Sequence, residues 1–248
     1  MDENLMEKDW DQRAKQDAVR YVADAFRGEE FFKDGTRQAH ELCHALFLKE
    51  GFTPEGKHML DIGCGIGRLD RGFSEMFAEV WGLDVSGEMI SQAKELNREF
   101  NNIKFVKGNG QDLSVFRNDY LDFVFSYITF QHIPEKKIIR SYFSEIHRVL
   151  KPGGLFKILL RKPWSGFAIA FGFIPVPRLI LRYMPGAVWS LYDRLVYRGE
   201  KRPYRGKTWR GTGISKKEAL KSLSSLKFEK VEIEEDPSGT TFWVTGRK

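Results

Sequence analysis

Glycines at alternate positions form the part of the chain best suited to hold a ligand. Gly63, Gly65 and Gly67 follow an apolar stretch, and Asp61 stands two residues before the first of them. Without side chains, such a loop lets the backbone approach a ligand closely. A dinucleotide loop would have its third glycine at position 68, which is Arg68, and the Gly-Lys-Ser/Thr of an ATP-binding loop is absent. An acid at position 61 suits a ligand with an ammonium group rather than a pyrophosphate.

Two later loops complete the pattern of a nucleoside site. Asp84, in the segment WGLDVS, comes at the end of the second expected strand, where a carboxylate can accept hydrogen bonds from both ribose hydroxyls. The segment GNGQDL, residues 108–113, follows another apolar stretch. Its backbone, with Gln111 or Asp112, can bind the edge of an adenine. Together the loops predict a pocket for an adenosine that carries an amino-acid tail.

Alternating strands and helices position these loops. Short apolar runs alternate with amphipathic segments, a rhythm typical of a parallel sheet with helices on both faces. Such sheets bind ligands at the carboxyl ends of their strands. We expect an α/β, Rossmann-like, doubly wound sheet, mostly parallel, whose last two strands form an antiparallel hairpin. The expected strands are 58–63, 79–86, 103–109, 120–130, 155–161, 229–236 and 240–248, and the expected helices are 68–78, 87–100, 136–154 and 215–228.

The chain divides into three regions by composition. Residues 1–54 predict an N-terminal cap of two helices, and residues 55–162 with 211–248 predict the core. Residues 163–210 break the rhythm, because they are aromatic, basic and interrupted by proline. We expect this insertion to be a helical lid over the active site.

Positive charge is concentrated in that insertion. The chain carries +6, but residues 161–210 hold 11 Lys/Arg against Asp193 and Glu200, so the remainder is about −3. A basic segment of this kind favours an anionic partner, a lipid headgroup surface or an acidic substrate. Its longest uncharged run, residues 163–177, is 15 residues long. A membrane span needs about 20 residues.

Composition indicates an ordinary globular protein. The chain has 248 residues, 42% of them hydrophobic and 30% charged. Its first residues, MDENLMEKDW, lack the apolar core of a secretory signal. Cys43 and Cys64 are the only cysteines, so we expect no disulfide framework and a cytoplasmic protein. No His, Cys or Asp cluster has the spacing of a metal site.

The motifs DIGCGIG, GLDVS, GNGQDL, DFVFSYITFQHIP and RVLKPGG occur in this order. Their order and spacing resemble the class I S-adenosylmethionine-dependent methyltransferases. The resemblance covers roughly residues 55–162 and resumes from about Thr212. It implies a methyltransferase whose cofactor is S-adenosyl-L-methionine.

The resemblance also implies roles for individual residues around that cofactor. Asp61 and the loop from Gly63 to Gly67 would hold the methionine part, and Asp84 the ribose. The family often has Asp at the position of Asn109, which leaves open whether Asn109, Gln111 or Asp112 binds the adenine amine. The full set of expected cofactor-binding residues is Asp61, Gly63, Cys64, Gly65, Gly67, Asp84, Val85, Met89, Asn109, Gly110, Gln111, Asp112, Ser126, Trp10 and Arg13.

Several of these residues have a plainer interpretation. Trp10 and Arg13, in the segment WDQRA, would close the pocket as in the family, but Trp10 also suits a packing anchor. Cys64 is a small loop residue with no partner cysteine for redox chemistry. His132 and Tyr127 follow the fourth core strand. His132 is a candidate general base, or else a structural residue, and Tyr127 is a candidate for positioning the substrate.

Two signature motifs of nucleic-acid methyltransferases are absent, and their absence limits the class of methyl acceptor. The Asn/Asp-Pro-Pro-Tyr/Phe signature of amino-methylating nucleic-acid enzymes is replaced by residues 126–129, Ser-Tyr-Ile-Thr. The cysteine motif of cytosine C5 enzymes is also lacking. We therefore expect a small-molecule, glycan or lipid-linked acceptor, with O-methylation preferred.

Three alternatives remain open for the partners. The first is an RNA or protein methyltransferase that docks through residues 161–210, although nucleic acid is disfavoured. The second is a non-catalytic cofactor-binding module. The third is that the insertion also contacts an anionic membrane at its surface, since aromatic and basic residues alternate there.

Overall fold

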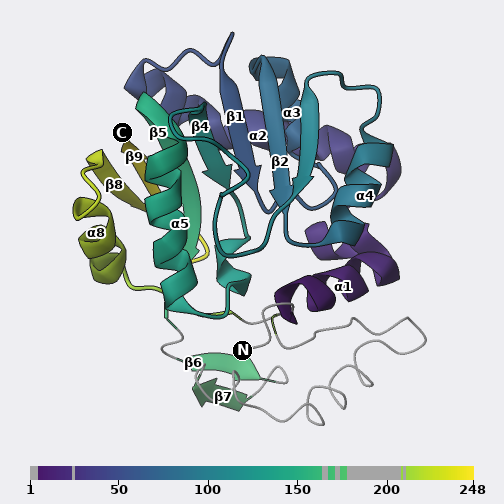
Figure 1. The fold of residues 1–248 in the computed structure, drawn as a ribbon. Helices are drawn as coiled ribbons and strands as arrows, with labels where there is room; N and C mark the ends of the chain where they lie inside the picture. The colour runs from purple at the N-terminus through teal and green to yellow at the C-terminus, as the bar shows by residue number, and fades with distance from the viewer. Residues whose placement is uncertain (1–4, 24–25, 164–166, 171–173, 178–207, 209–210) are drawn as a thin grey trace.

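The fold is built on one seven-stranded sheet, seen in a computed structural model (Figure 1). The structure describes residues 5–23, 26–163, 208 and 211–248, and the backbone alone of 167–170 and 174–177. The strand order is β3-β2-β1-β4-β5-β9-β8. Its strands are β1 His58–Ile62, β2 Glu79–Asp84, β3 Ile103–Lys107, β4 Leu121–Ser126, β5 Leu150–Arg161, β8 Glu229–Glu235 and β9 Thr241–Arg247. The first five are parallel, and β9 is antiparallel to both β5 and β8, which confirms the expected doubly wound sheet.

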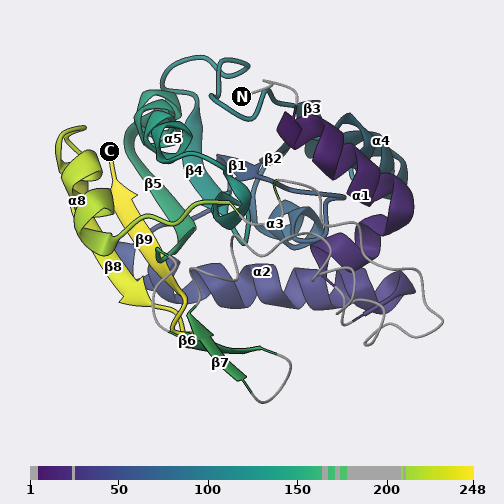
Figure 2. The same cartoon turned by 90° about the horizontal axis from the view of Figure 1, so that it is seen from below.

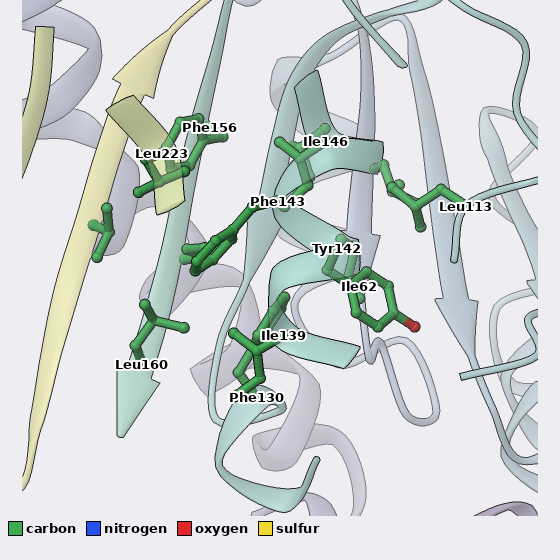
Figure 3. Packing of buried hydrophobic residues seen from close by; sticks show 14 of the residues in the cluster. Ile62, Leu113, Phe130, Ile139, Tyr142, Phe143, Ile146, Phe156, Leu160 and Leu223 are labelled. Carbon is green, nitrogen blue, oxygen red and sulfur yellow. The ribbon is translucent and has the colours of Figure 1, made fainter. Parts of the chain in front are cut away.

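Helices cover both faces of this sheet (Figure 2). On one face α2 Gly28–Glu50, α3 Asp70–Met76 and α4 Gly87–Leu96 pack against the strands. On the other face lie α5 Lys136–Val149 and α8 Lys216–Ser224. Here Phe143 and Ile146 of α5 and Phe156 of β5 belong to one cluster of buried side chains (Figure 3). Burying each such side chain contributes about 1.5–3 kcal/mol.

Local sequence explains where several helices begin or end. Gly51 takes the left-handed conformation, φ 58°, and its N–H closes the carboxyl end of α2. Ser215 and Glu218 form a reciprocal capping box at the start of α8. Ser86 accepts a hydrogen bond from the N–H of Met89 and so caps α4. Ser86 thereby also fixes the loop that follows β2.

The two N-terminal helices differ in their roles. Helix α2 belongs to the core, because Ala39, Cys43 and Phe47 are buried against the sheet. Helix α1, Leu5–Val22, lies instead against α4, at the carboxyl ends of the parallel strands (Figures 1 and 2). Only α1 therefore has the place expected of a cap.

The described part of the insertion is a β-hairpin and not a helix. Strands β6 Phe167–Ala170 and β7 Ile174–Pro177 pair antiparallel and form a sheet of their own. Pro175 and Pro177 explain the difference, since proline is excluded from helix interiors. Most of the rest of the expected lid, residues 178–207, lies outside the described residues. No described helix combines the length and hydropathy needed to cross a bilayer.

Candidate active site

A large pocket opens at the carboxyl ends of β1, β2 and β4, beneath α1. It encloses about 1010 Å³ of empty space, part of which is open to solvent. Loops after all three strands contribute to its wall, as expected for a doubly wound sheet. The wall is formed by Met6, Trp10, Tyr21, Val22, Asp61, Ile62, Gly63, Cys64, Gly65, Arg68, Leu69, Leu83, Asp84, Val85, Met89, Gly110, Tyr127, Ile128, Thr129, His132, Ile133 and Tyr142.

The glycine loop is closely packed from both sides. The N–H groups of Gly63 and Cys64 donate to the carbonyl of Leu83, at 2.7 and 3.1 Å. A Cβ on Gly63 would lie 2.1 Å from Oγ1 of Thr129, and one on Gly65 2.7 Å from Val22 of α1. Both glycines have positive φ, 82° and 56°. The loop therefore requires glycine at these positions for space and for conformation.

Asp61 presents a buried carboxylate to this pocket. Its side chain is 3% exposed. Burial, followed by the negative charge of Asp84, raises the pKa of Asp61 to about 8, while Arg68 lowers it. Arg68 does not neutralise it directly, because the guanidinium contacts Asp34 at 3.0 Å and also Gln38. A cationic group in the pocket would stabilise ionised Asp61, as an amino-acid ammonium does.

Asp84 stands at the end of β2 and is held by backbone donors. Its Oδ2 accepts a hydrogen bond of 3.1 Å from the N–H of Gly65, and its Oδ1 accepts one of 2.9 Å from the N–H of Ser86. Burial raises the pKa of Asp84 to about 6, although these hydrogen bonds lower it. The carboxylate is thus ionised at neutral pH and has a fixed orientation at the pocket wall.

A further acid lies behind the glycine loop. Asp70, at the first residue of α3, is fully buried, and neither carboxylate oxygen has a hydrogen-bond partner among the described residues. Burial, followed by the charge of Asp61, raises its pKa well above the usual range. The site therefore concentrates acidic groups next to a pocket that suits a cation.

Helix α1 closes the pocket and is tied to the sheet. Oδ1 of Asp11 accepts hydrogen bonds from Oγ of Ser86 at 2.6 Å and from the N–H of Glu88 at 3.1 Å. Glu7 forms an ion pair of 2.6 Å with Lys107 at the end of β3. Both contacts fix α1 across the ends of β2 and β3.

Trp10 joins this helix to the far wall of the pocket. Its ring meets the imidazole of His132 edge to face, with centroids 5.0 Å apart. The guanidinium of Arg13 lies 4.4 Å from the centroid of the same Trp10 ring. Arg13 is fully buried and donates to the hydroxyl of Thr208 at 3.4 Å, so it supports Trp10 instead of lining the pocket. Asp9 accepts a hydrogen bond from the N–H of Thr208.

The loop after β3 contributes less than the sequence suggested. Gly110 lines the pocket, and a Cβ there would lie 2.5 Å from Met6. Asn109 and Gln111 are exposed, and Oδ1 of Asn109 accepts the N–H groups of Gln111 and Asp112. These side chains shape the turn and are not part of the described pocket wall.

The end of β4 places two expected residues differently. Ser126 is buried, and its hydroxyl donates to the carbonyl of Ile62 at 2.7 Å, so it joins β4 to β1. Tyr127 lines the pocket, and its ring stacks on Trp243 with centroids 5.7 Å apart. Burial, followed by the charge of Asp236, raises the pKa of Tyr127. Its phenol is therefore a hydrogen-bond donor at neutral pH.

The pocket gathers most of the expected residues. Those that line it are Trp10, Asp61, Gly63, Cys64, Gly65, Asp84, Val85, Met89, Gly110, Tyr127 and His132, and those that do not are Arg13, Gly67, Asn109, Gln111, Asp112 and Ser126. Gly67 packs instead against Asn97 and Phe105. Wall residues that the motifs did not indicate are Met6, Tyr21, Val22, Ile62, Arg68, Leu69, Leu83, Ile128, Thr129, Ile133 and Tyr142. No local signal showed that residues of the N-terminal helix would cover a pocket.

The sheet order and a ligand pocket at the carboxyl ends of its strands define the class I fold of S-adenosylmethionine-dependent methyltransferases. Residues 60–158 match the family described as "Methyltransferase domain". The match covers the part of the core from β1 to β5.

Known methyltransferases resemble the chain in sequence or in fold. The chain is 33% identical over 136 residues to the sterol 24-C-methyltransferase ERG6A of Gibberella zeae, covering 53% of this chain and 33% of that protein. It is 32% identical over 136 residues to the sterol 24-C-methyltransferase erg6 of Aspergillus fumigatus, covering 53% and 34%. The chain thus spans about one third of the length of these curated relatives. Magnesium protoporphyrin IX methyltransferase from Synechocystis, solved with bound SAH, has the same fold, with a TM-score of 0.60, 14% identity and 100% of both chains covered.

Proposed function

We propose that this protein transfers the methyl group of S-adenosylmethionine to an apolar small molecule. The observation that carries the proposal is one pocket whose wall combines two acids with many apolar side chains. Asp61 and Asp84 flank the glycine loop, and apolar residues of the same wall include Ile128 and Ile133. The two acids suit a cationic amino-acid nucleoside, and the apolar side chains suit an uncharged acceptor.

The residues present fit this cofactor. Asp61 would hold the ammonium group, the backbone from Gly63 to Gly65 the methionine chain, and Asp84 the ribose hydroxyls. Bound S-adenosylmethionine supplies an electrophilic methyl group on a sulfonium. Trp10 and the rest of α1 exclude water, so the protein's main task is to orient the acceptor. His132, which lines the pocket, is the proposed base if the acceptor must lose a proton.

The acceptor class draws support from the relatives. Their names specify methylation of sterols at carbon 24, so an apolar lipid-like acceptor agrees with them. Their names give no support to O-methylation. We therefore propose the class of acceptor and not the atom that receives the methyl group.

A lipid-like acceptor would also bring the protein to membranes. The basic segment 161–210 is the proposed contact with anionic headgroups and the proposed lid, and most of it lies outside the described residues. Flotation with vesicles of phosphatidylcholine and phosphatidylserine, compared with phosphatidylcholine alone, tests this contact. Binding that needs the anionic lipid supports it, and equal or absent flotation contradicts it.

Methyl transfer itself can be tested without knowing the acceptor. The purified protein is incubated with a cell extract and S-adenosylmethionine labelled with tritium in its methyl group. The extract is then separated into chloroform-soluble lipids, small polar metabolites, RNA and protein. We expect label in the chloroform phase, and less of it with Asp84→Asn at a cofactor concentration that does not saturate the variant. Label in RNA or protein would instead support docking of a macromolecule on residues 161–210, and no label in any fraction would support a non-catalytic binding module.

A further inference from the structure

Ile128 has a backbone conformation that its residue type disfavours. Its φ is 58°, in the left-handed region, directly after β4. Left-handed backbone is uncommon for any residue with a side chain, and a β-branched residue there is a genuine outlier. Glycine or asparagine would allow the same turn with less strain. The strained conformation therefore needs an explanation in the side chain.

Neighbours on both sides hold this conformation in place. The ring of Tyr127 is stacked on Trp243, which fixes the residue before the turn. The hydroxyl of Thr129 donates to the carbonyl of Tyr127 at 3.1 Å, and the N–H of His132 donates to the carbonyl of Thr129 at 3.0 Å. Residues kept in a disfavoured conformation by their surroundings cluster at functional sites.

The side chain of Ile128 is not used in the core. It is 40% exposed and belongs to the pocket wall, to which Trp10 and Ile133 also contribute. The other described residues with positive φ and a side chain are Asp119, Lys227 and Lys230, all polar and none in the pocket wall. Among the described residues, Ile128 alone combines a strained backbone, a β-branched side chain and a place in the pocket.

We infer that Ile128 determines acceptor specificity by packing its side chain against the apolar methyl acceptor. The inference rests on the proposed function, because it assumes that an acceptor enters this pocket and contacts its apolar side chains. Glycine would allow this turn but would give the pocket wall no side chain at this position, whereas isoleucine gives it an apolar one. The acceptor class it favours is an uncharged molecule with a hydrocarbon surface.

The test uses Nile red, a neutral apolar dye, as a probe of the apolar side chains of the pocket. The dye is titrated into the full chain in the presence of saturating S-adenosylhomocysteine. Ile128→Gly should bind the dye about fivefold more weakly, because the apolar contact is lost. The same variant should raise Tm by about 2 °C, because backbone strain is relieved. Its Kd for S-adenosylhomocysteine should change less than twofold.

Two further variants separate side chain from backbone. Ile128→Val keeps the β-branch and should retain dye binding within twofold with no rise in Tm. Lys227→Gly relieves a left-handed residue outside the pocket, φ 60°, and should raise Tm without affecting the dye. Unchanged dye binding in Ile128→Gly, or a lower Tm, would overturn the inference. Failure of the unaltered protein to bind S-adenosylhomocysteine would instead overturn the proposed function.

Discussion

The hydroxyl of Ser86 donates a hydrogen bond of 2.6 Å to the carboxylate of Asp11, across 75 residues of sequence. The N–H of Ser86 donates at the same time to Asp84, at 2.9 Å. Ser86 therefore links the N-terminal helix to the carboxylate proposed to bind ribose. Closure of the pocket and orientation of Asp84 depend on the same residue.

Asp11→Ala should speed release of S-adenosylhomocysteine about tenfold, equivalent to about 1.4 kcal/mol. The substitution removes two hydrogen bonds that hold α1 over the pocket. Stopped-flow tryptophan fluorescence measures the rate. Glu95→Ala is the control, since Glu95 is an exposed acid on α4 outside the pocket wall. Equal release rates in both variants would show that α1 is not held by Asp11.

Asp84→Asn should weaken S-adenosylhomocysteine binding by about 1.5–3 kcal/mol, the usual loss for a hydrogen bond to a charged group. An amide keeps the size of the side chain but cannot accept through both of its terminal atoms. Isothermal titration calorimetry measures the affinity. Asp119→Asn makes the same change outside the pocket wall and should have no effect. Near-native affinity in Asp84→Asn would refute its ribose role.

Cofactor binding should release a proton near neutral pH. The pKa of Asp61 is raised to about 8, whereas that of an unfolded aspartate is about 3.9. Between these values the folded chain holds a proton that the unfolded chain lacks, so this contribution to stability is greatest below pH 4 and is lost as pH rises through 8. A bound ammonium favours ionised Asp61 and expels the proton.

The affinity for S-adenosylhomocysteine should therefore rise between pH 6 and pH 8. At pH 7, the heat of binding should differ between phosphate and Tris buffers by the amount expected for proton release. Asp61→Asn should lose much of this difference along with affinity. Identical heats in both buffers for the unaltered protein would contradict a protonated Asp61.

His132→Ala should lower methyl transfer about 100-fold if the imidazole removes a proton from the acceptor. Transfer of tritium to the chloroform-soluble product measures it, and the Kd for S-adenosylhomocysteine should change little. His40→Ala, on the exposed side of α2, is the control. A loss below tenfold would leave His132 as a packing partner of Trp10.

The site residues that could be predicted most reliably from the sequence are those at the ends of the strands, because the order of the strands determines where they lie. Asp61 and Asp84 lie at the carboxyl ends of neighbouring parallel strands, and parallel strands bring such ends together at one edge. Asn109 and Gln111 have the right position along the chain, but hydrogen bonds within the turn determine where their side chains lie. A sequence motif does not show whether such a side chain will bond to its own turn or to a ligand.

The features of the site that could not be predicted from the sequence depend on packing between residues far apart in the chain. The contact of Trp10 with His132 joins residues far apart in sequence, and helical spacing alone cannot choose that partner. Tyr127, the residue before Ile128, likewise stacks on Trp243, a residue far away in sequence. For the hairpin β6–β7, Pro175 and Pro177 were local signals against the expected helix.

Calorimetric titration with S-adenosylhomocysteine, NAD and ATP tests the central claim most directly. The account predicts one molecule of S-adenosylhomocysteine per chain, no displacement by NAD or ATP, and binding weakened by about 1.5–3 kcal/mol with Asp84→Asn. Binding of NAD or ATP in this pocket, or no binding of S-adenosylhomocysteine, would contradict it.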